Sequence, residues 1–325
     1  MSDIYRIRAA AARGRGHVRR TPLLSAAALD KRAGRRVWVK AECLQVTGSF
    51  KARGAWAAVS ALAPEALARG VLAFSSGNHA QGVAWAAAAH GAPAVILMPQ
   101  DAPMVKIEGT KALGAEVVLY DRLTQDRAEL GAEIAGARGM TIVPPYDHPE
   151  VIAGQGTTGL EIAQDAAEAG IRAAEVLVCC GGGGLASGIA LALSAEAPDF
   201  SVRTVEPAGF DDMAQSLLAG DWRSNARPTG SICDAILTPR PGQMTFPILR
   251  NLAGEGLAVT DDEALRAMSL AFAHLNVVLE PGGAVALAAA LFHGADLRAE
   301  DVIAVASGGN VEPSLFAEAI TRHRA

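Results

Sequence analysis

The sequence predicts an α/β protein in which open parallel β-sheets are flanked by helices. Short apolar runs alternate along the chain with longer, alanine-rich amphipathic runs, and this alternation is typical of parallel strands joined by right-handed crossovers. Half of the 325 residues are hydrophobic and only 5% are aromatic, which suits closely packed helices and strands. A chain of this length is expected to form about two domains.

The short apolar runs are continuous in the way that strands buried on both faces are. We expect these strands at residues 37–40, 71–74, 94–98, 116–120, 176–180, 201–205 and 302–306. The amphipathic runs predict helices at residues 52–62, 81–90, 103–113, 124–137, 157–169 and 185–195. An arginine-rich segment at residues 6–20 is expected to be the first helix of the mature chain. These are too many strands for one small sheet.

Charge and cysteine content exclude several functional classes. The net charge is −5 and no basic stripe occurs, so nucleic acid is not an expected partner. No apolar run reaches the length of a membrane span without polar interruption, so we expect no membrane partner either. The four cysteines show no Cys-x-x-Cys spacing, which favours a reducing compartment over a disulfide frame or a zinc site. We therefore expect a cytoplasmic protein.

Lys51 is the most informative single residue. It follows Gly48-Ser49-Phe50 at the point where an expected strand has ended and a helix begins. The positive end of the helix dipole and burial beside Phe50 both lower the pKa of a lysine. A lysine with a lowered pKa is an amine nucleophile that forms Schiff bases with carbonyl groups.

A run of four glycines follows the expected strand at 176–180 and precedes a helix. Gly181, Gly182, Gly183 and Gly184 leave backbone N–H groups free to surround an anion such as a phosphate monoester. The same loop approximates a dinucleotide fingerprint, with Glu206 ending the next strand where an acid would hold a ribose. A phosphate site is the preferred interpretation, and an NAD-dependent oxidoreductase remains the alternative.

Two further polar loops follow expected strands. In Ser75-Ser76-Gly77-Asn78-His79, the first-turn N–H groups and the serine hydroxyls can hold a carboxylate, although one serine could instead cap the helix. Ser307-Gly308-Gly309-Asn310 follows the last strand.

These motifs together resemble the fold-type II pyridoxal-phosphate enzymes, and specifically the threonine/serine dehydratase and serine racemase group. Gly-Ser-Phe-Lys-Ala-Arg-Gly-Ala around Lys51 is similar to the cofactor-lysine motif of this group, and the other motifs occur in the family's order over nearly the whole chain. The resemblance implies a two-domain, tryptophan synthase β-like fold. Residues 1–62 and 148–325 would form the large cofactor-binding domain, and residues 63–147 a small domain inserted in it.

The resemblance also assigns roles to the motif residues. Lys51 would hold pyridoxal 5′-phosphate covalently and act with Ser76 in proton transfer. The other cofactor contacts would come from Phe50, Asn78, Gly181, Gly182, Gly183, Gly184, Leu185 and Ser307. Ser75, Ser76 and His79 would bind the α-carboxylate of an amino-acid substrate. A serine hydroxyl at the ring nitrogen, in place of a carboxylate, leaves the ring a weaker electron sink and favours β-elimination over transamination.

Three positions refine the resemblance. Glu206, the Phe210 carbonyl and Asp212 have the spacing of a structural Mg²⁺ or Ca²⁺ site in the racemase group, although acids at a helix start are also favourable by the dipole alone. Arg127 stands where relatives place an arginine that reaches the substrate, and it would suit the β-carboxylate of hydroxyaspartate, although it could equally be a surface residue of the helix expected at 124–137. Ala235 replaces the usual glycine of the family.

The sequence therefore predicts a homodimeric ammonia-lyase that converts L-threonine or L-serine to a 2-oxo acid and ammonia. Hydroxyaspartate dehydration and serine racemisation are alternatives within the family. An NAD-dependent oxidoreductase that uses the glycine loop and a non-catalytic amino-acid-binding protein are alternatives from other classes.

Overall fold

The chain forms two separate β-sheets. The computed structural model describes residues 2–102, 104–121 and 123–323. The larger sheet has six strands in the order β1 (Leu23–Ser25), β2 (Arg36–Lys40), β10 (Asp301–Val305), β7 (Ala174–Cys179), β8 (Phe200–Pro207) and β9 (Leu257–Val259). The smaller sheet has four strands in the order β5 (Glu116–Tyr120), β4 (Ala94–Pro99), β3 (Val71–Phe74) and β6 (Thr141–Ile142).

Nearly every strand pair is parallel. Among the strands of the described residues, only β1 runs antiparallel, against β2 at the edge of the larger sheet. Every residue of β4, β7 and β10 is buried, which is the pattern of parallel strands covered by helices on both faces. The alternating sequence pattern therefore predicted the fold class correctly.

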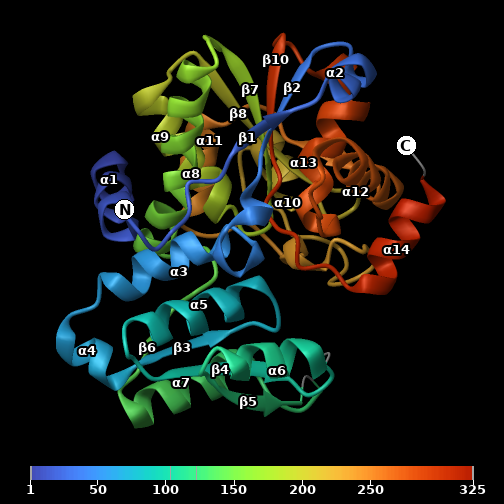
Figure 1. The fold of residues 1–325 in the computed structure, drawn as a ribbon. Coiled ribbons are helices and arrows are strands. Elements are labelled where there is room, and N and C mark those ends of the chain that lie inside the picture. The colour runs from blue at the N-terminus through green and yellow to red at the C-terminus, as the bar shows by residue number, and fades with distance from the viewer. Residues whose placement is uncertain (1, 103, 122, 324–325) are drawn as a thin grey trace.

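The helices cover both sheets, as Figure 1 shows. They are α1 (Ile4–Gly14), α2 (Ala27–Ala33), α3 (Lys51–Ser60), α4 (Pro64–Arg69), α5 (Asn78–Ala89), α6 (Met104–Ala112), α7 (Arg127–Arg138), α8 (Pro149–Glu168), α9 (Gly184–Glu196), α10 (Asp212–Ala219), α11 (Thr245–Leu252), α12 (Asp261–Leu275), α13 (Pro281–Phe292) and α14 (Pro313–Arg322). No helix in the described part of the chain is both long enough and apolar enough to cross a membrane.

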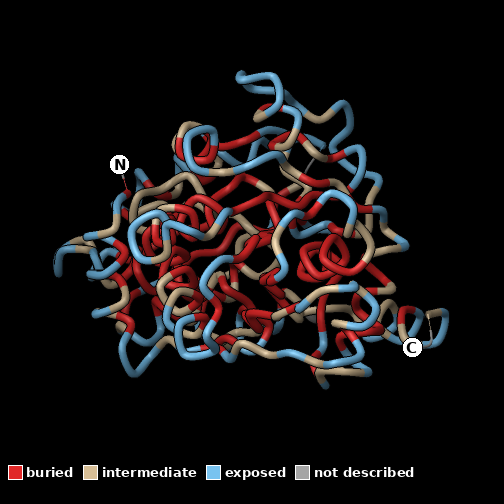
Figure 2. Tube along the Cα trace, turned by 90° about the horizontal axis from the view of Figure 1, so that it is seen from above, coloured by how far each residue is buried: buried red, intermediate tan, exposed pale blue. Residues whose placement is uncertain are grey.

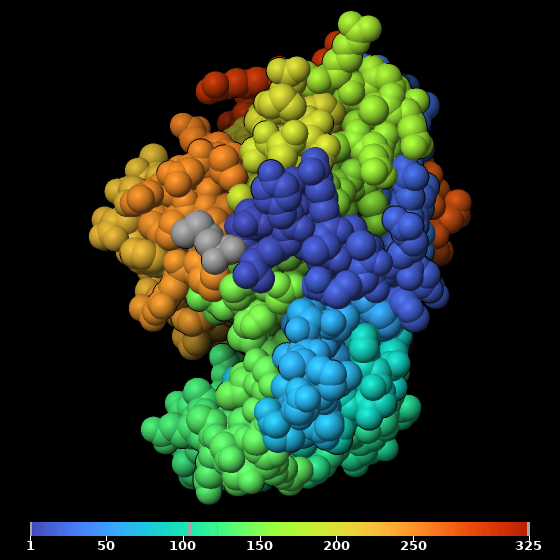
Figure 3. Space-filling model, turned by 90° about the vertical axis from the view of Figure 1, so that its left-hand side faces the viewer, coloured from blue at the N-terminus to red at the C-terminus, as the bar shows by residue number. Residues whose placement is uncertain are grey.

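We call β3–β6 with α5, α6 and α7 the small unit, and the six-stranded sheet with its helices the large unit. The small unit is the lower lobe in Figure 1 and appears as the cyan and green lobe in Figure 3. The large unit and the small unit each contain a buried apolar cluster, a third cluster joins the small unit to α3 and the start of α8, and buried segments run through the interior in Figure 2. We call the boundary between the two units the seam.

The helix that follows β2 is anchored in the interior by buried charges. Arg53, in the first turn of α3, is 2% exposed and donates to Glu42 Oε2 at 2.7 Å and to Glu161 Oε1 at 2.7 Å. Glu42 lies between β2 and α3, and Glu161 lies on α8. Because a buried arginine is costly to leave unpaired, these contacts hold the start of α3, and with it Lys51, in one position.

Several boundaries differ from the sequence prediction. The helix expected at 157–169 begins at Pro149, because His148 caps it through a bond from the Glu150 N–H to Nδ1 and proline is favourable in the first turn. Residue 103, the expected start of α6, lies outside the described residues. The short strands β1, β6 and β9 were not predicted, because two or three residues show no periodicity.

Candidate active site

Lys51 is the first residue of α3, and its amine lies in a cavity of the seam. The Nζ atom donates to the Pro145 carbonyl at 2.8 Å. Burial lowers the pKa of Lys51 to about 8, while the nearby ionisable groups of Cys179 and Glu280 oppose the shift. A large fraction of this amine is neutral at a slightly alkaline pH, as a nucleophilic lysine requires.

The four glycines form a cradle at the start of α9. A Cβ atom on Gly182 would lie 2.3 Å from the Tyr146 ring, and one on Gly184 would lie 2.5 Å from Gln155 Oε1. Gly183 has a φ of +90°, which side-chain-bearing residues rarely adopt. Gly183 therefore requires glycine, a Cβ atom on Gly182 or Gly184 would have to push a neighbouring side chain aside, and the positive end of α9 lies at the cavity.

The start of α5, after the loop that follows β3, has N–H groups available for a ligand. The N-cap of α5 is Gly77, which has no side chain to cap the helix, and Ser75 Oγ accepts from the Gly77 N–H at 3.1 Å. Neither serine therefore caps α5 as the alternative interpretation suggested. The first-turn N–H groups of α5 lack intrahelical partners and can hold a carboxylate.

His79 is buried and neutral. Its Nε2 atom lies 2.8 Å from the Val143 carbonyl, so this nitrogen carries the proton, and Nδ1 has no hydrogen-bond partner among the described residues. Burial lowers the pKa of His79 to about 3, and the Lys51 charge adds to the shift. The ring has no free donor for a carboxylate, so a contact from His79 would come from its backbone N–H.

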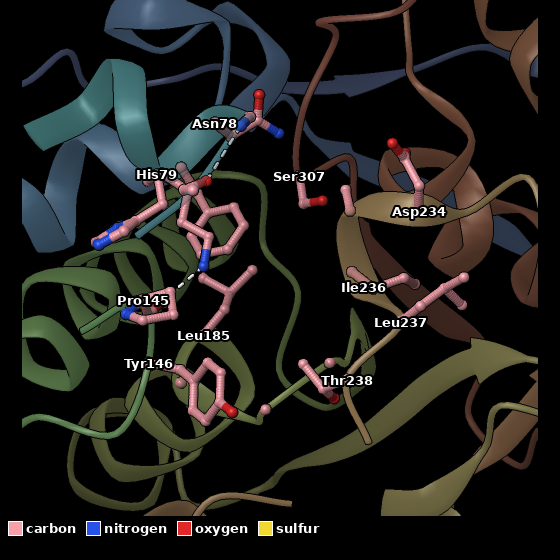
Figure 4. A pocket seen from close by; sticks show the side chains of 18 of the residues that line it. Asn78, His79, Pro145, Tyr146, Leu185, Asp234, Ile236, Leu237, Thr238 and Ser307 are labelled. Atoms are coloured by element: carbon pink, nitrogen blue, oxygen red, sulfur yellow. Dashed lines mark hydrogen bonds between the residues drawn. The ribbon is translucent and has the colours of Figure 1, made fainter. Parts of the chain in front are cut away.

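One cavity of about 380 Å³ brings the motifs together, which is within the usual size of a small-molecule site. Its lining includes Phe50, Lys51, Ser75, Ser76, Asn78, His79, Arg127, Gly181, Gly182, Gly183, Gly184, Leu185 and Ser307. Figure 4 shows Asn78 and His79 on one side of the cavity, with Ser307 and Asp234 on the other. All residues expected to contact cofactor or substrate thus line the same space.

Arg127 enters this cavity from the first turn of α7. Arg127 is also an exposed residue, so solvent reaches the cavity at this position. Burial raises the pKa of Tyr146, and the positive charge of Arg127 opposes that rise, so the guanidinium lies within electrostatic range of the phenol. Ala235 also lines the cavity, so its methyl group occupies space that a glycine would leave open.

The three residues of the expected cation site lie outside the cavity. Glu206 accepts from the backbone N–H groups of Met213 and Ala214 at 3.0 and 2.8 Å, so it caps α10. Asp212 Oδ1 accepts from Asn225, but the buried Oδ2 has no partner among the described residues. Glu206 therefore faces α10 and does not line the cavity that contains the glycine loop, which does not suit the ribose contact that the dinucleotide alternative requires.

Several cavity residues were not assigned a role from the sequence. They are Phe74, Lys106, Pro145, Gln155, Asp234, Thr238, Glu280 and Asn310. The sequence around Glu280 shows that an acidic residue precedes a helix that begins with Pro281-Gly282-Gly283. It does not show that Glu280 contacts Asn78, which is remote in sequence. Burial raises the pKa of Glu280 to about 7.

The lining fits pyridoxal 5′-phosphate. The glycine cradle offers N–H groups to a phosphate, and the Lys51 amine opens into the same cavity. The buried Ser307 supplies a hydroxyl at the end of β10. A phosphate site and an amine nucleophile in one cavity are the two features that an aldehyde phosphate ester requires.

Comparison with known proteins gives the family. The family described as "Pyridoxal-phosphate dependent enzyme" matches residues 15–308. The L-threo-3-hydroxyaspartate ammonia-lyase of Pseudomonas sp is 40% identical over 98% of both chains. The threonine deaminase of T.th. superposes with a TM-score of 0.90 at 42% identity, covering 95% of this chain and 99% of the other. Maize serine racemase has a TM-score of 0.91 at 34% identity and covers 99% of this chain and 98% of its own. The chain therefore belongs to the pyridoxal-phosphate-dependent enzymes, within the fold-type II group of threonine/serine dehydratases and serine racemases.

Proposed function

We propose that this protein is an ammonia-lyase that removes water from a β-hydroxy amino acid and releases a 2-oxo acid and ammonia. The observation that carries the proposal is the shared cavity, in which the Lys51 amine, the glycine cradle and the carboxylate-binding loop after β3 face one another. When bound, pyridoxal phosphate supplies the electron sink that makes the substrate's Cα–H bond acidic.

The protein's own residues supply binding and proton transfer. Gly181–Gly184 would hold the phosphate, and the first-turn N–H groups of α5 would hold the substrate's α-carboxylate. The Lys51 Nζ atom would accept the proton from the substrate's Cα. Ser76 acts on the opposite face, and its hydroxyl is the group through which partial racemisation would occur.

A hydroxyaspartate is the favoured substrate, ahead of serine or threonine. Arg127 lines the cavity and carries a positive charge, and a substrate β-carboxylate would pair with its guanidinium. The Pseudomonas relative carries this substrate in its name.

Arg127→Ala tests the substrate assignment. We expect kcat/KM for 3-hydroxyaspartate to fall about 10- to 100-fold, as for loss of a charged hydrogen bond, while kcat/KM for serine stays within about twofold. For Arg127→Lys, kcat/KM for 3-hydroxyaspartate should lie between the values of wild type and Arg127→Ala, because lysine keeps the charge but not the planar guanidinium group. An equal fall in kcat/KM for both substrates would contradict the substrate assignment. If the protein is yellow and binds amino acids but forms no 2-oxo acid, it is a binding protein and not an ammonia-lyase.

The domain division, the assembly and the location are part of the same proposal. Residues 63–147 form the small domain, residues 1–62 and 148–325 form the large one, and two chains form a cytoplasmic homodimer, as the family resemblance implies. The four cysteines are free thiols, which agrees with a reducing compartment.

A structural Mg²⁺ or Ca²⁺ at Glu206, the Phe210 carbonyl and Asp212 completes the proposal. The unpartnered, buried Oδ2 of Asp212 supports it, because a hard cation prefers carboxylate and carbonyl oxygens. The engagement of both Glu206 oxygens by α10 means that the cation would share this carboxylate with the helix cap.

A further inference from the structure

Asn78 is held across the seam by two residues of the large unit. Its Nδ2 atom donates to Glu280 Oε1 at 2.6 Å, and its Oδ1 atom accepts from Asn310 Nδ2 at 2.7 Å. The Asn310 amide nitrogen also donates to the Thr47 carbonyl at 2.8 Å, in the loop that leads to Lys51. We call Glu280, Asn78 and Asn310 the seam clamp.

The seam clamp permits only one direction of the Asn78 amide. The Asn310 NH₂ group donates both to the Thr47 carbonyl and to Asn78 Oδ1, and Glu280 is an acceptor on the other side, so Asn78 must accept from Asn310 and donate to Glu280. A reversed Asn78 would place its carbonyl against the Glu280 carboxylate and its NH₂ group against the NH₂ group of Asn310. In the observed direction, Asn78 has one N–H left, and this residue lines the cavity.

We propose that Glu280 is a positioning residue of the cofactor site, which together with Asn310 holds Asn78 so that an N–H donor is presented to the cavity. The donor suits an anionic oxygen, such as the phenolic oxygen of the cofactor, whereas a carbonyl would repel it. Because Asn78 begins α5, the seam clamp also fixes the carboxylate-binding turn relative to Lys51. The inference rests on the cofactor site of the proposed function and not on the identity of the substrate.

Because Glu280 can ionise, its hydrogen bond with Asn78 should depend on pH, which a purely structural contact would not. Burial raises its pKa to about 7, and the bond from Asn78 lowers it. The other charged or titratable groups that act on Glu280, or on which it acts, are Asp234, Lys106, Lys51, Cys43 and Cys179. Above neutral pH the bond from Asn78 is charge-assisted, and below it the bond is neutral and weaker.

The first test uses the wild-type apoprotein. The chain has five asparagines, so selective ¹⁵N-asparagine labelling yields five side-chain NH₂ groups, and Asn78→Ala identifies the one of interest. Between about pH 5.5 and 8.5 the Asn78 NH₂ signals should shift with a midpoint near the ionisation of Glu280. In Glu280→Gln the shift should disappear. Signals that do not move in wild type, or that move equally in Glu280→Gln, would overturn the proposal whatever the enzyme's substrate is.

The second test measures cofactor affinity. Glu280→Ala leaves a buried N–H without an acceptor and should weaken pyridoxal-phosphate binding about tenfold or more. Glu280→Gln keeps an acceptor oxygen, so it should recover most of the affinity at neutral pH. Glu175→Gln is the matched control, because Glu175 is 6% exposed against 7% for Glu280 and accepts backbone N–H groups away from the cavity. Wild-type affinity in Glu280→Ala would contradict the positioning role. If that variant fails to fold, the pH titration of the Asn78 NH₂ signals still tests the proposal.

Discussion

The glycine cradle makes a quantitative prediction at Gly182. A Cβ atom there would meet three atoms of the Tyr146 ring at 2.3, 2.3 and 2.4 Å, whereas ordinary contact begins at 3.4 Å. The ring would therefore have to move by roughly 1 Å, and overpacking of this kind costs about 1–3 kcal/mol. Gly182 is not among the glycines with positive φ, so the backbone itself accepts alanine. We expect Gly182→Ala to lower the free energy of unfolding of the apoprotein by this amount.

The assay combines urea unfolding of the apoprotein with cofactor binding followed by visible absorbance. Because the cradle must rearrange, the dissociation constant of pyridoxal phosphate should rise about tenfold for each 1.4 kcal/mol lost at the site. Gly136→Ala is the control: a Cβ atom there meets nothing within 4 Å inside α7, so alanine should stabilise the protein by about 0.5–1 kcal/mol.

A double-mutant cycle identifies the cause of the loss. Tyr146→Ala removes the ring, so the further addition of Gly182→Ala should cost much less than it does in wild type. If Gly182→Ala is as stable as wild type, or if its cost is unchanged in the Tyr146→Ala background, the ring does not restrict the cradle and the reasoning fails.

Three further predictions concern the amine and the cation. Lys51→Ala should abolish covalent attachment of the cofactor, so that borohydride reduction followed by mass spectrometry finds no adduct on the protein; an adduct on another lysine would refute the assignment. Burial lowers the pKa of Lys51 to about 8, and only the neutral amine attacks, so the rate of covalent attachment should rise with pH and level off above about pH 8. If the rate levels off only near the ordinary pKa of lysine, the amine is solvated and the reasoning fails. Mg²⁺ or Ca²⁺ should raise the melting temperature of wild type but not that of Asp212→Asn, and equal responses would remove the cation from the proposal.

Local patterns predicted the elements that carry the chemistry. The apolar runs at β3, β7 and β10 are continuous because parallel strands are buried on both faces, and the polar or glycine-rich loops that follow them are visible without knowledge of the fold. Lys51 could be identified because the residues around it resemble a family motif, and comparison with known proteins confirmed that family.

Contacts between remote residues could not be predicted in this way. Asn78 lies 202 positions from Glu280 and 232 from Asn310, and no periodicity links them. Glu206 has a spacing that suits a ribose or a cation, yet its oxygens cap α10, because the end of β8 lies beside the start of that helix. The close approach of the Tyr146 ring to Gly182 likewise depends on how the loop before α8 crosses the cradle.

By itself, the sequence determined that parallel strands end in loops able to bind a phosphate and a carboxylate, and that a lysine begins a helix among them. Burial and strand length are local properties, so residue pattern is sufficient for these features. Only the tertiary structure decided that the loops of two sheets meet at one seam, that burial lowers the pKa of Lys51, and that Glu280 faces Asn78. These depend on how the small unit sits against the large one, which follows from packing over the whole chain.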